Sequence, residues 1–112
     1  MANDFKNAVK TNIAIDSGTY TTLYTAPSGK ASILLELDIA NTSAATIDAS
    51  VTVTDSSASV TAHVVKGLTI PAGNTARVIA GQKIVLEATD IVKVAASASN
   101  AADCVATVLE DV

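Results

Sequence analysis

The feature that most constrains the fold of this chain is a series of short hydrophobic runs, each ended by small, turn-forming residues. The stretch GLTIPAGNTARVIAGQKIVLEATDIVKVAA, residues 67–96, shows this rhythm. Within the runs, hydrophobic and polar residues alternate, as expected for strands that bury one face. About eight such runs follow one another, and no helical crossover pattern lies between them. The chain is therefore predicted to be all-β and antiparallel.

Turn signals separate these runs. In residues 26–29 and 71–74, a proline presets one φ angle and a glycine two residues later supplies a positive φ. Further breaks are expected at residues 55–57, at Gly81-Gln82, at residues 88–90 and at residues 97–102. The spacing predicts an antiparallel β-sandwich of about eight short strands, jelly-roll-like in preference to the immunoglobulin-like alternative.

The alternation also assigns side chains to faces. One inward set is expected to comprise Ile33, Leu35, Leu37 and Ile39, with Leu34, Glu36, Asp38 and Ala40 on the other face. A second inward set comprises Ile47, Ala49, Val51 and Val53, with Asp48, Ser50, Thr52 and Thr54 toward water. Farther along, Gly67 beside Lys66 predicts a β-bulge that turns the lysine outward.

Residues 1–15 differ from the rest of the chain. Phe5, Val9 and Ile13 are spaced four apart, on one face of a short amphipathic helix. Short isolated helices are marginal in water, so the segment could equally be an arm that orders against a neighbouring subunit. Both alternatives stay open. The chain is thus divided into an arm or helix (1–15) and a sandwich domain (16–112), with Phe5, Val9 and Ile13 as candidate interface residues.

Composition argues against ligand binding and nucleic-acid binding. The 112 residues suit one domain, and 49% of them are hydrophobic, but there are only one Phe, two Tyr and no Trp. Few aromatic residues make poor walls for a ligand pocket and no stacking platform for single-stranded nucleic acid. The net charge is −4, and the seven basic residues are scattered, so no nucleic acid is expected as a partner.

No segment indicates membrane targeting. The start MANDFKNAVK lacks the apolar core of a signal peptide, and no stretch approaches the length of a membrane span. We therefore expect folding in a cytoplasm, without a membrane partner.

Residues able to do chemistry are few and isolated. Cys104 is a single cysteine in an alternating run and is expected to be a small buried hydrophobe. His63 is the one histidine and is expected on a strand surface. Glu36 and Asp38 share a face and could hold a cation or act as acid and base, although a solvated strand face carries such pairs routinely. No nucleophile elbow or calcium loop is present, so no catalytic, cofactor or metal residue is predicted.

The strand-bearing region resembles small virion structural proteins of tailed bacteriophages, especially of the cyanophage and marine phage type. The shared phrases are YTAP, ANTS, VTVTD, IPAG, GQKIVLEATD and a closing strand ending TVLE, over about residues 20–110. Similar proteins often have glycine where this chain has Thr89, and threonine would make a positive φ there more costly. The match to the glycosylation sequon at residues 41–43 is interpreted as chance, since no secretory signal precedes it.

The resemblance implies a particle component and not an enzyme. The function expected from it is a capsid decoration or cement protein that binds the outer head surface and stabilises the capsid. Its partners would be the major capsid protein or other virion proteins, and it would form a homo-oligomer, with a trimer as the expected state. Its location would be the virion, assembled in the host cytoplasm. The alternatives are a neck, tail or baseplate accessory protein, or a module that binds host-surface glycans through Tyr20 and Tyr24.

Overall fold

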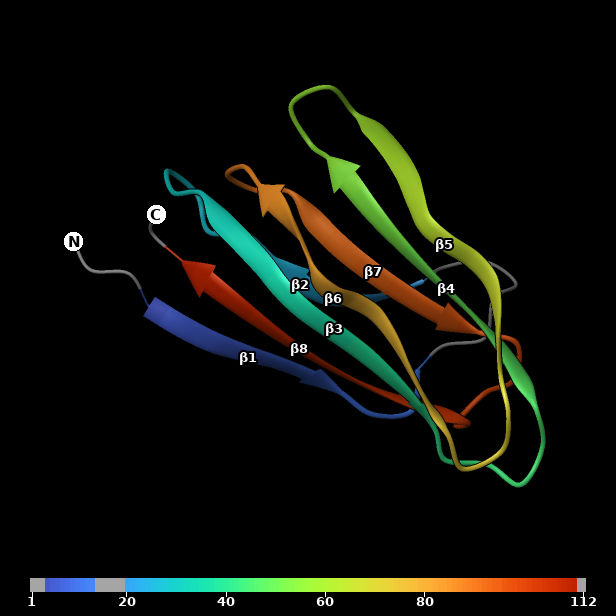
Figure 1. Ribbon diagram of the computed structural model, residues 1–112. Helices are drawn as coiled ribbons and strands as arrows, with labels where there is room; N and C mark the ends of the chain where they lie inside the picture. Colours follow the sequence, from blue (N-terminus) through green and yellow to red (C-terminus); the bar gives the residue numbers. More distant parts are fainter. Residues whose placement is uncertain (1–3, 14–19, 111–112) are drawn as a thin grey trace.

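The computed structural model describes residues 4–13 and 20–110 of the chain (Figure 1). These residues form eight strands and no helix. The strands are β1 (Asp4–Lys10), β2 (Thr21–Thr25), β3 (Ser32–Asn41), β4 (Ile47–Asp55), β5 (Val60–Ile70), β6 (Thr75–Leu86), β7 (Ile91–Ala96) and β8 (Ala102–Glu110). Accordingly, the described part of the chain offers no helical segment with the length and hydropathy needed to span a bilayer.

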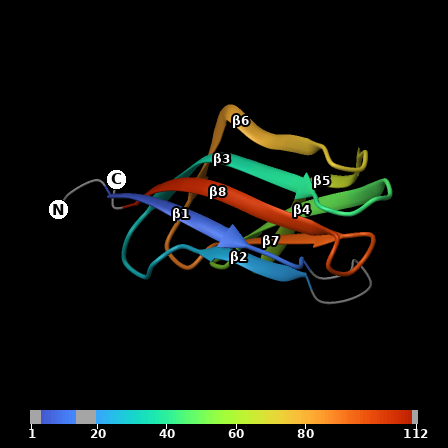
Figure 2. The same ribbon diagram turned by 90° about the horizontal axis from the view of Figure 1, so that it is seen from below.

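The strands pair into two four-stranded sheets that lie face to face (Figure 2). The first sheet has the order β1-β8-β3-β6 and the second the order β2-β7-β4-β5, with every pair antiparallel. The pairings β1–β8, β2–β7, β3–β6 and β4–β5 are nested around the middle of the chain. Such nesting is a long hairpin rolled into two sheets, which is the jelly roll. The predicted β-sandwich is confirmed, and its topology is that of a jelly roll and not that of an immunoglobulin domain.

The number of strands is the expected one, but the two runs predicted on either side of Gly81-Gln82 form a single strand, β6. The break expected at Gly81-Gln82 does not end a strand, because β6 continues through it. Gly81 has a φ of 115° and Lys83 a φ of 53°, and the pairing with β3 skips from Ala80 to Ile84 at this point. The kink is therefore a bulge within one long strand. The eighth strand is supplied by β1, at the N-terminal end.

The helical alternative for the N-terminal segment is wrong over residues 4–10, which form an edge strand of the first sheet. A spacing of four places residues on one face of a strand as well as of a helix, so Phe5 and Val9 still share a face. Ile13 lies beyond the strand, after Asn12 at a φ of 53°, and is buried in the core. The backbone N–H of Ile13 donates to the carbonyl of Ala102, which ties the end of the segment to β8.

One predicted face was wrong for half of β3. Leu34 is buried, while Ile33 and Leu35 are only half-buried. The cause is a β-bulge between Leu34 and Glu36, where the register shifts toward both neighbouring strands. One extra residue in a strand inverts the alternation on one side of it. Beyond the bulge the prediction holds, because Leu37 and Ile39 are fully buried.

In β4 the inward set is as predicted, but two residues expected to face water are buried. Ser50 accepts a hydrogen bond of 3.1 Å from the backbone N–H of Gly67. Thr52 lies between the larger side chains of His63 and Lys93, its cross-strand partners. The bulge predicted at Gly67 is confirmed, with a φ of 70° and a shift of register there, and it leaves Lys66 exposed.

Asn41 at the end of β3 forms hydrogen bonds to the connection that follows β3 and to the end of β5. Its side chain is 2% exposed, and its Nδ2 donates to the carbonyls of Ala45 and Ile70. Its Oδ1 accepts from the N–H and the hydroxyl of Ser43. A buried amide engaged in four hydrogen bonds is not accessible to a glycan, so the sequon at residues 41–43 marks a structural turn.

In the turn between β6 and β7, Thr89 has a φ of 68°, so this threonine adopts the costly positive φ. A β-branched residue is strained in that conformation. Its hydroxyl hydrogen-bonds to the hydroxyl of Ser56 and to the carbonyl of Ala88. These bonds hold in place a turn for which glycine would be the unstrained residue.

Candidate functional site

The outer face of the first sheet carries a row of apolar side chains that crosses all four strands. Phe5 of β1 lies opposite Leu109 of β8, Leu109 opposite Ile33 of β3, and Ile33 opposite Val85 of β6. We call these four residues the apolar row. Its two ends are open to solvent, since Phe5 is 71% and Val85 65% exposed.

A second apolar pair extends this surface farther along β1 and β8. Val9 lies opposite Val105, and they are 56% and 48% exposed. A soluble protein exposes single apolar residues routinely, but neighbouring ones on a single sheet face mark a surface that binds another molecule. The outer face of the first sheet is therefore the best candidate for a binding surface among the described residues.

The three candidate interface residues predicted from sequence are separated by the fold. Phe5 and Val9 lie on this outer face, whereas Ile13 is 1% exposed and packs within the chain's own core. A role of Phe5 and Val9 in contact with another subunit stays a prediction. Ile33, Val85, Val105 and Leu109 were not predicted as surface residues. One signal was present, because the run CVATVLE is apolar on both faces of a strand.

Glu36 and Asp38 share the same outer face, as predicted. Asp38 lies opposite Val105 on one side and Arg77 on the other. Its Oδ1 is buried without a hydrogen-bond partner. Burial raises the pKa of the Asp38 carboxyl, and the adjacent Glu36 carboxylate raises it further, while Arg77 acts in the opposite direction. The neutral form of the Asp38 carboxyl is therefore favoured, and both residues lie on the outer face of a strand.

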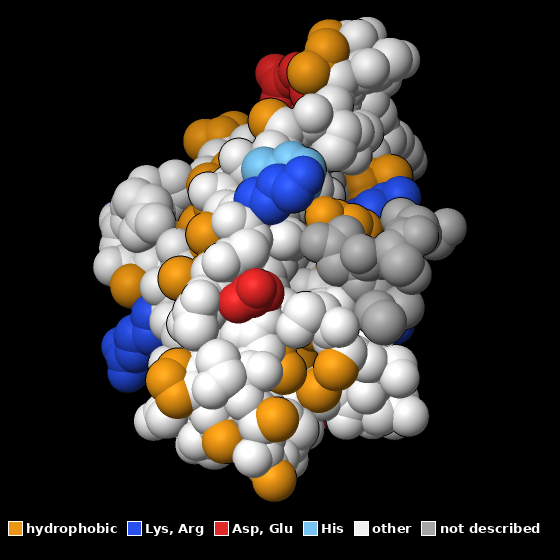
Figure 3. Space-filling model, turned by 90° about the vertical axis from the view of Figure 1, so that its right-hand side faces the viewer, with side chains coloured by type: hydrophobic (Ala, Val, Ile, Leu, Met, Phe, Trp, Pro, Cys, Tyr) orange, Lys and Arg blue, Asp and Glu red, His pale blue; other side chains and the backbone are white. Residues whose placement is uncertain are grey.

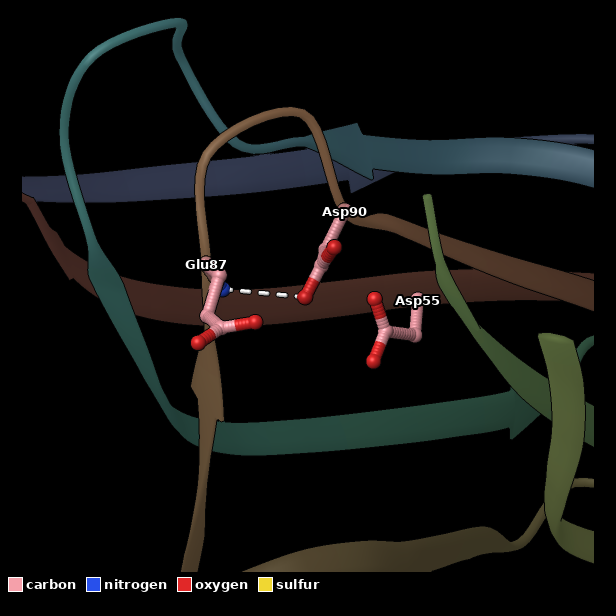
Figure 4. Close-up of side chains that lie close together, drawn as sticks. All are labelled: Asp55, Glu87 and Asp90. Carbon is pink, nitrogen blue, oxygen red and sulfur yellow. Dashed lines mark hydrogen bonds between the residues drawn. The ribbon is translucent and has the colours of Figure 1, made fainter. Parts of the chain in front are cut away.

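Three other carboxylates converge where the turn after β4 meets the turn after β6 (Figure 4). They belong to Asp55, Glu87 and Asp90, and one oxygen of each lies within 4.8 Å of the others. Oxygen ligands of this kind are those that calcium prefers. The sequence did not predict this cluster, because its members come from separate turns that only the fold brings together.

The hydrogen bonds of the cluster account for its position without a cation. Asp90 is buried and accepts from the backbone N–H of Ser56 at 3.1 Å and of Glu87 at 2.9 Å. Asp55 accepts from the N–H and hydroxyl of Ser57, and these bonds lower the pKa of its carboxyl. The two aspartates thus fix the turns, and the outward oxygens of Asp55 and Glu87 are what remains for a cation.

His63 lies on the surface of β5, as predicted. Its Nε2 is 3.3 Å from the hydroxyl of Tyr20, and the two rings meet edge to face with centroids 6.1 Å apart. On this side of the molecule, hydrophobic side chains are scattered and charged ones are few (Figure 3).

The remaining reactive groups are structural. Cys104 is fully buried, and burial raises the pKa of its thiol to about 12, so it does not act as a nucleophile at neutral pH. Tyr24 is half-buried and hydrogen-bonds to Ser32 and Glu110, and burial with the bond to Glu110 raises the pKa of its hydroxyl to about 12. Tyr20 and Tyr24 make separate contacts, because a bulge between Thr22 and Tyr24 interrupts their alternation.

Comparison with known proteins shows a similarity of fold. No protein-family model matches this chain, and no curated protein matches it. It is similar to a chain in the crystal structure of the T13 IBDV viral particle, with a TM-score of 0.56 and 13% sequence identity over 96% of this chain and 30% of that chain.

Weaker similarities concern the same virus. A chain in the structure of the Gx strain of infectious bursal disease virus has a TM-score of 0.49 and 14% identity over 97% of this chain and 31% of that chain. A chain in the VP2 subviral particle of infectious bursal disease virus has a TM-score of 0.48 and 14% identity over 96% of this chain and 32% of that chain. This chain spans less than a third of the length of these solved chains. At such identity the likeness to the T13 particle chain concerns the jelly-roll fold alone.

Proposed function

We propose that this protein is a virion structural protein, and that it acts as a capsid decoration or cement protein of a tailed bacteriophage. The observation that carries the proposal is the jelly roll, since the similarity to a chain of a viral particle covers 96% of this chain. The resemblance of its sequence phrases to small phage virion proteins supports the narrower class. A non-enzymatic role accords with the burial of Cys104 and with the contact of His63 to a tyrosine and not to a carboxylate or a nucleophile.

The outer face of the first sheet is the surface that we expect to meet the capsid. A cement protein stabilises a shell by burying contact area against neighbouring capsid subunits. The apolar row supplies exposed hydrophobic area at both ends, at Phe5 and Val85. The partners under this proposal are the major capsid protein or other virion proteins, and the location is the virion.

The copy number of the protein tests the decoration role. We would quantify this chain by mass spectrometry in purified particles of the source virus, relative to the major capsid protein. A ratio near one copy per capsid subunit is expected for a decoration protein. A few copies per particle would overturn that role in favour of a neck, tail or baseplate position, and absence from the particle would overturn the virion role itself.

A further inference from the structure

β1 is an edge strand with one paired side. Among the described strands, only β8 pairs with it, so its second edge presents backbone N–H and C=O groups without a strand partner. Six of its seven residues are exposed, and Ala8 is its one buried side chain. Open edges of this kind are templates for pairing with another chain.

β1 also differs from the other three edge strands in its regularity. Its seven residues pair with β8 in an unbroken register, from Asp4 opposite Glu110 to Lys10 opposite Cys104. The pairings of β2, β5 and β6 each contain at least one register shift. Bulges protect sheet edges, because they twist the backbone groups away from an incoming strand. β1 has no such protection over its described length.

Symmetry limits how two copies could join through this edge. Two identical edges face each other when a two-fold axis runs normal to the sheet between them, and the strands are then antiparallel. The axis places one residue of β1 opposite the same residue of the second copy, so every possible register is centred on a residue. Only registers centred on Lys6, Asn7 or Ala8 pair at least five residues of β1 with the second copy.

The charges of β1 distinguish among these three registers. Centring on Lys6 places that lysine opposite itself, and centring on Ala8 places Lys6 opposite Lys10 twice; like charges directly opposite destabilise a sheet. Centring on Asn7 pairs all seven residues and places Asp4 opposite Lys10 at both ends. On the other face it places Phe5 opposite Val9, an aromatic residue opposite a β-branched one.

We propose that the protein forms a two-fold dimer with a second copy through the open edge of β1, centred on Asn7, with Asp4 of each copy opposite Lys10 of the other. The first sheets of the two copies become one continuous eight-stranded sheet. The apolar row then continues across the junction, from Phe5 to Val9 and Val105 of the second copy. The dimer stands independently of the virion role, and the contact is two-fold, whereas the trimer expected from the resemblance requires a different contact.

A cysteine at the centre of the register tests the dimer directly. In the full chain, Asn7→Cys places the new thiol opposite itself at a Cα separation of about 4.5–5.5 Å, within the range of a disulfide. Mild oxidation should convert most of this variant to a cross-linked dimer. Val9→Cys is the matched control on the same strand face, since its two copies lie about 13 Å apart along the strands. Native Cys104 is fully buried and should not interfere.

Charge reversal tests the register without a cross-link. Asp4→Lys and Lys10→Asp each place like charges opposite each other at both ends, and each should weaken the dimer about tenfold in sedimentation equilibrium. The double variant restores opposite charges and should return to within about twofold of the original dissociation constant. Lys66→Asp, on the exposed part of β5, is the control and should change nothing.

Three outcomes would overturn the proposal. They are a wild-type chain that stays monomeric at millimolar concentration, a double charge variant as weak as the single ones, and cross-linking of Val9→Cys as efficient as that of Asn7→Cys. Both experiments use pure protein. Their failure therefore leaves the copy number in virions, and hence the proposed function, untouched.

Discussion

The two sheets of this sandwich have outer faces of opposite character. The first sheet exposes Phe5, Val85, Val9 and Val105. On the second sheet, polar side chains bond to one another: Thr54 contacts Thr61 at 2.8 Å, and Thr69 donates to Asp48 at 3.1 Å. The exposed valines of that sheet, Val60 and Val64, lie on its edge strand β5 and are not part of an apolar row.

This difference indicates which outer face remains exposed to water and which one associates. A strand face whose hydroxyls and carboxylates satisfy each other is stable as an outer surface. A face with an apolar row favours association, because covering it removes apolar surface from water and lowers the free energy. One edge points the same way: β1 of the first sheet pairs with β8 without interruption, whereas both edges of the second sheet, β2 and β5, and the other edge of the first sheet, β6, contain register shifts. Both properties indicate that association uses the first sheet.

The largest effect is expected from removing the ends of the apolar row. The double variant Phe5→Ser/Val85→Ser should bind at least tenfold more weakly to virus particles depleted of the native protein, because both side chains are exposed in the free protein and available to be buried on the shell. Each substitution should change the free energy of unfolding by no more than about 0.5 kcal/mol, as is usual at exposed positions.

The matched control for this double variant lies on the other sheet. Val60→Ser removes a valine of β5 that is 56% exposed, and it should leave particle binding unchanged. If the control and the double variant bind alike, exposed apolar residues act without regard to their position, and the apolar row has no special role in binding.

The next effect concerns the turns at one end of the second sheet. Asp90→Ala should lower the free energy of unfolding by about 1–3 kcal/mol, because it leaves the N–H groups of Ser56 and Glu87 without their acceptor. Asp48→Ala is the control, since its bond to Thr69 is exposed and replaceable by water. Urea unfolding measures both. Equal losses would show that burial of Asp90 adds nothing to the stability of these turns.

Much of the fold could be predicted from the sequence because period-two alternation is a local property. It identified the runs that became β2 to β5, β7 and β8, and it located the turns around Gly29, Gly73 and Thr89. It failed where one extra residue inverts the alternation of inward and outward side chains, as at the bulge of β3. It also failed at β1, because a spacing of four fits a helix and a strand equally well.

The candidate surface was beyond local reasoning. The apolar row joins residues 5, 33, 85 and 109, and only the registers of three strand pairs bring them into line. The acidic cluster at Asp55 and Asp90 has the same origin, since two distant turns meet there. Phe5, Val9 and Ile13 were identified as candidate interface residues because their spacing of four places them on one face of a short amphipathic segment. Their partners on the sheet required the fold.

The smallest effect concerns Asp38, the carboxyl that interrupts the apolar surface of the first sheet. Burial and Glu36 raise its pKa in the folded protein above that of the unfolded chain. The neutral form is therefore favoured by folding, and its contribution to stability is complete below the unfolded pKa of about 4 and is lost as the pH rises through the folded pKa. Asp38→Asn should accordingly raise the urea midpoint at pH 7, with a gain that shrinks toward pH 3.5. Glu36→Gln should lower the pKa of Asp38 and move this window to lower pH. A gain of the same size at both pH values would mean that the charge of Asp38 costs the folded state nothing. In that case Asp38 would be as well solvated as a polar residue of the second sheet.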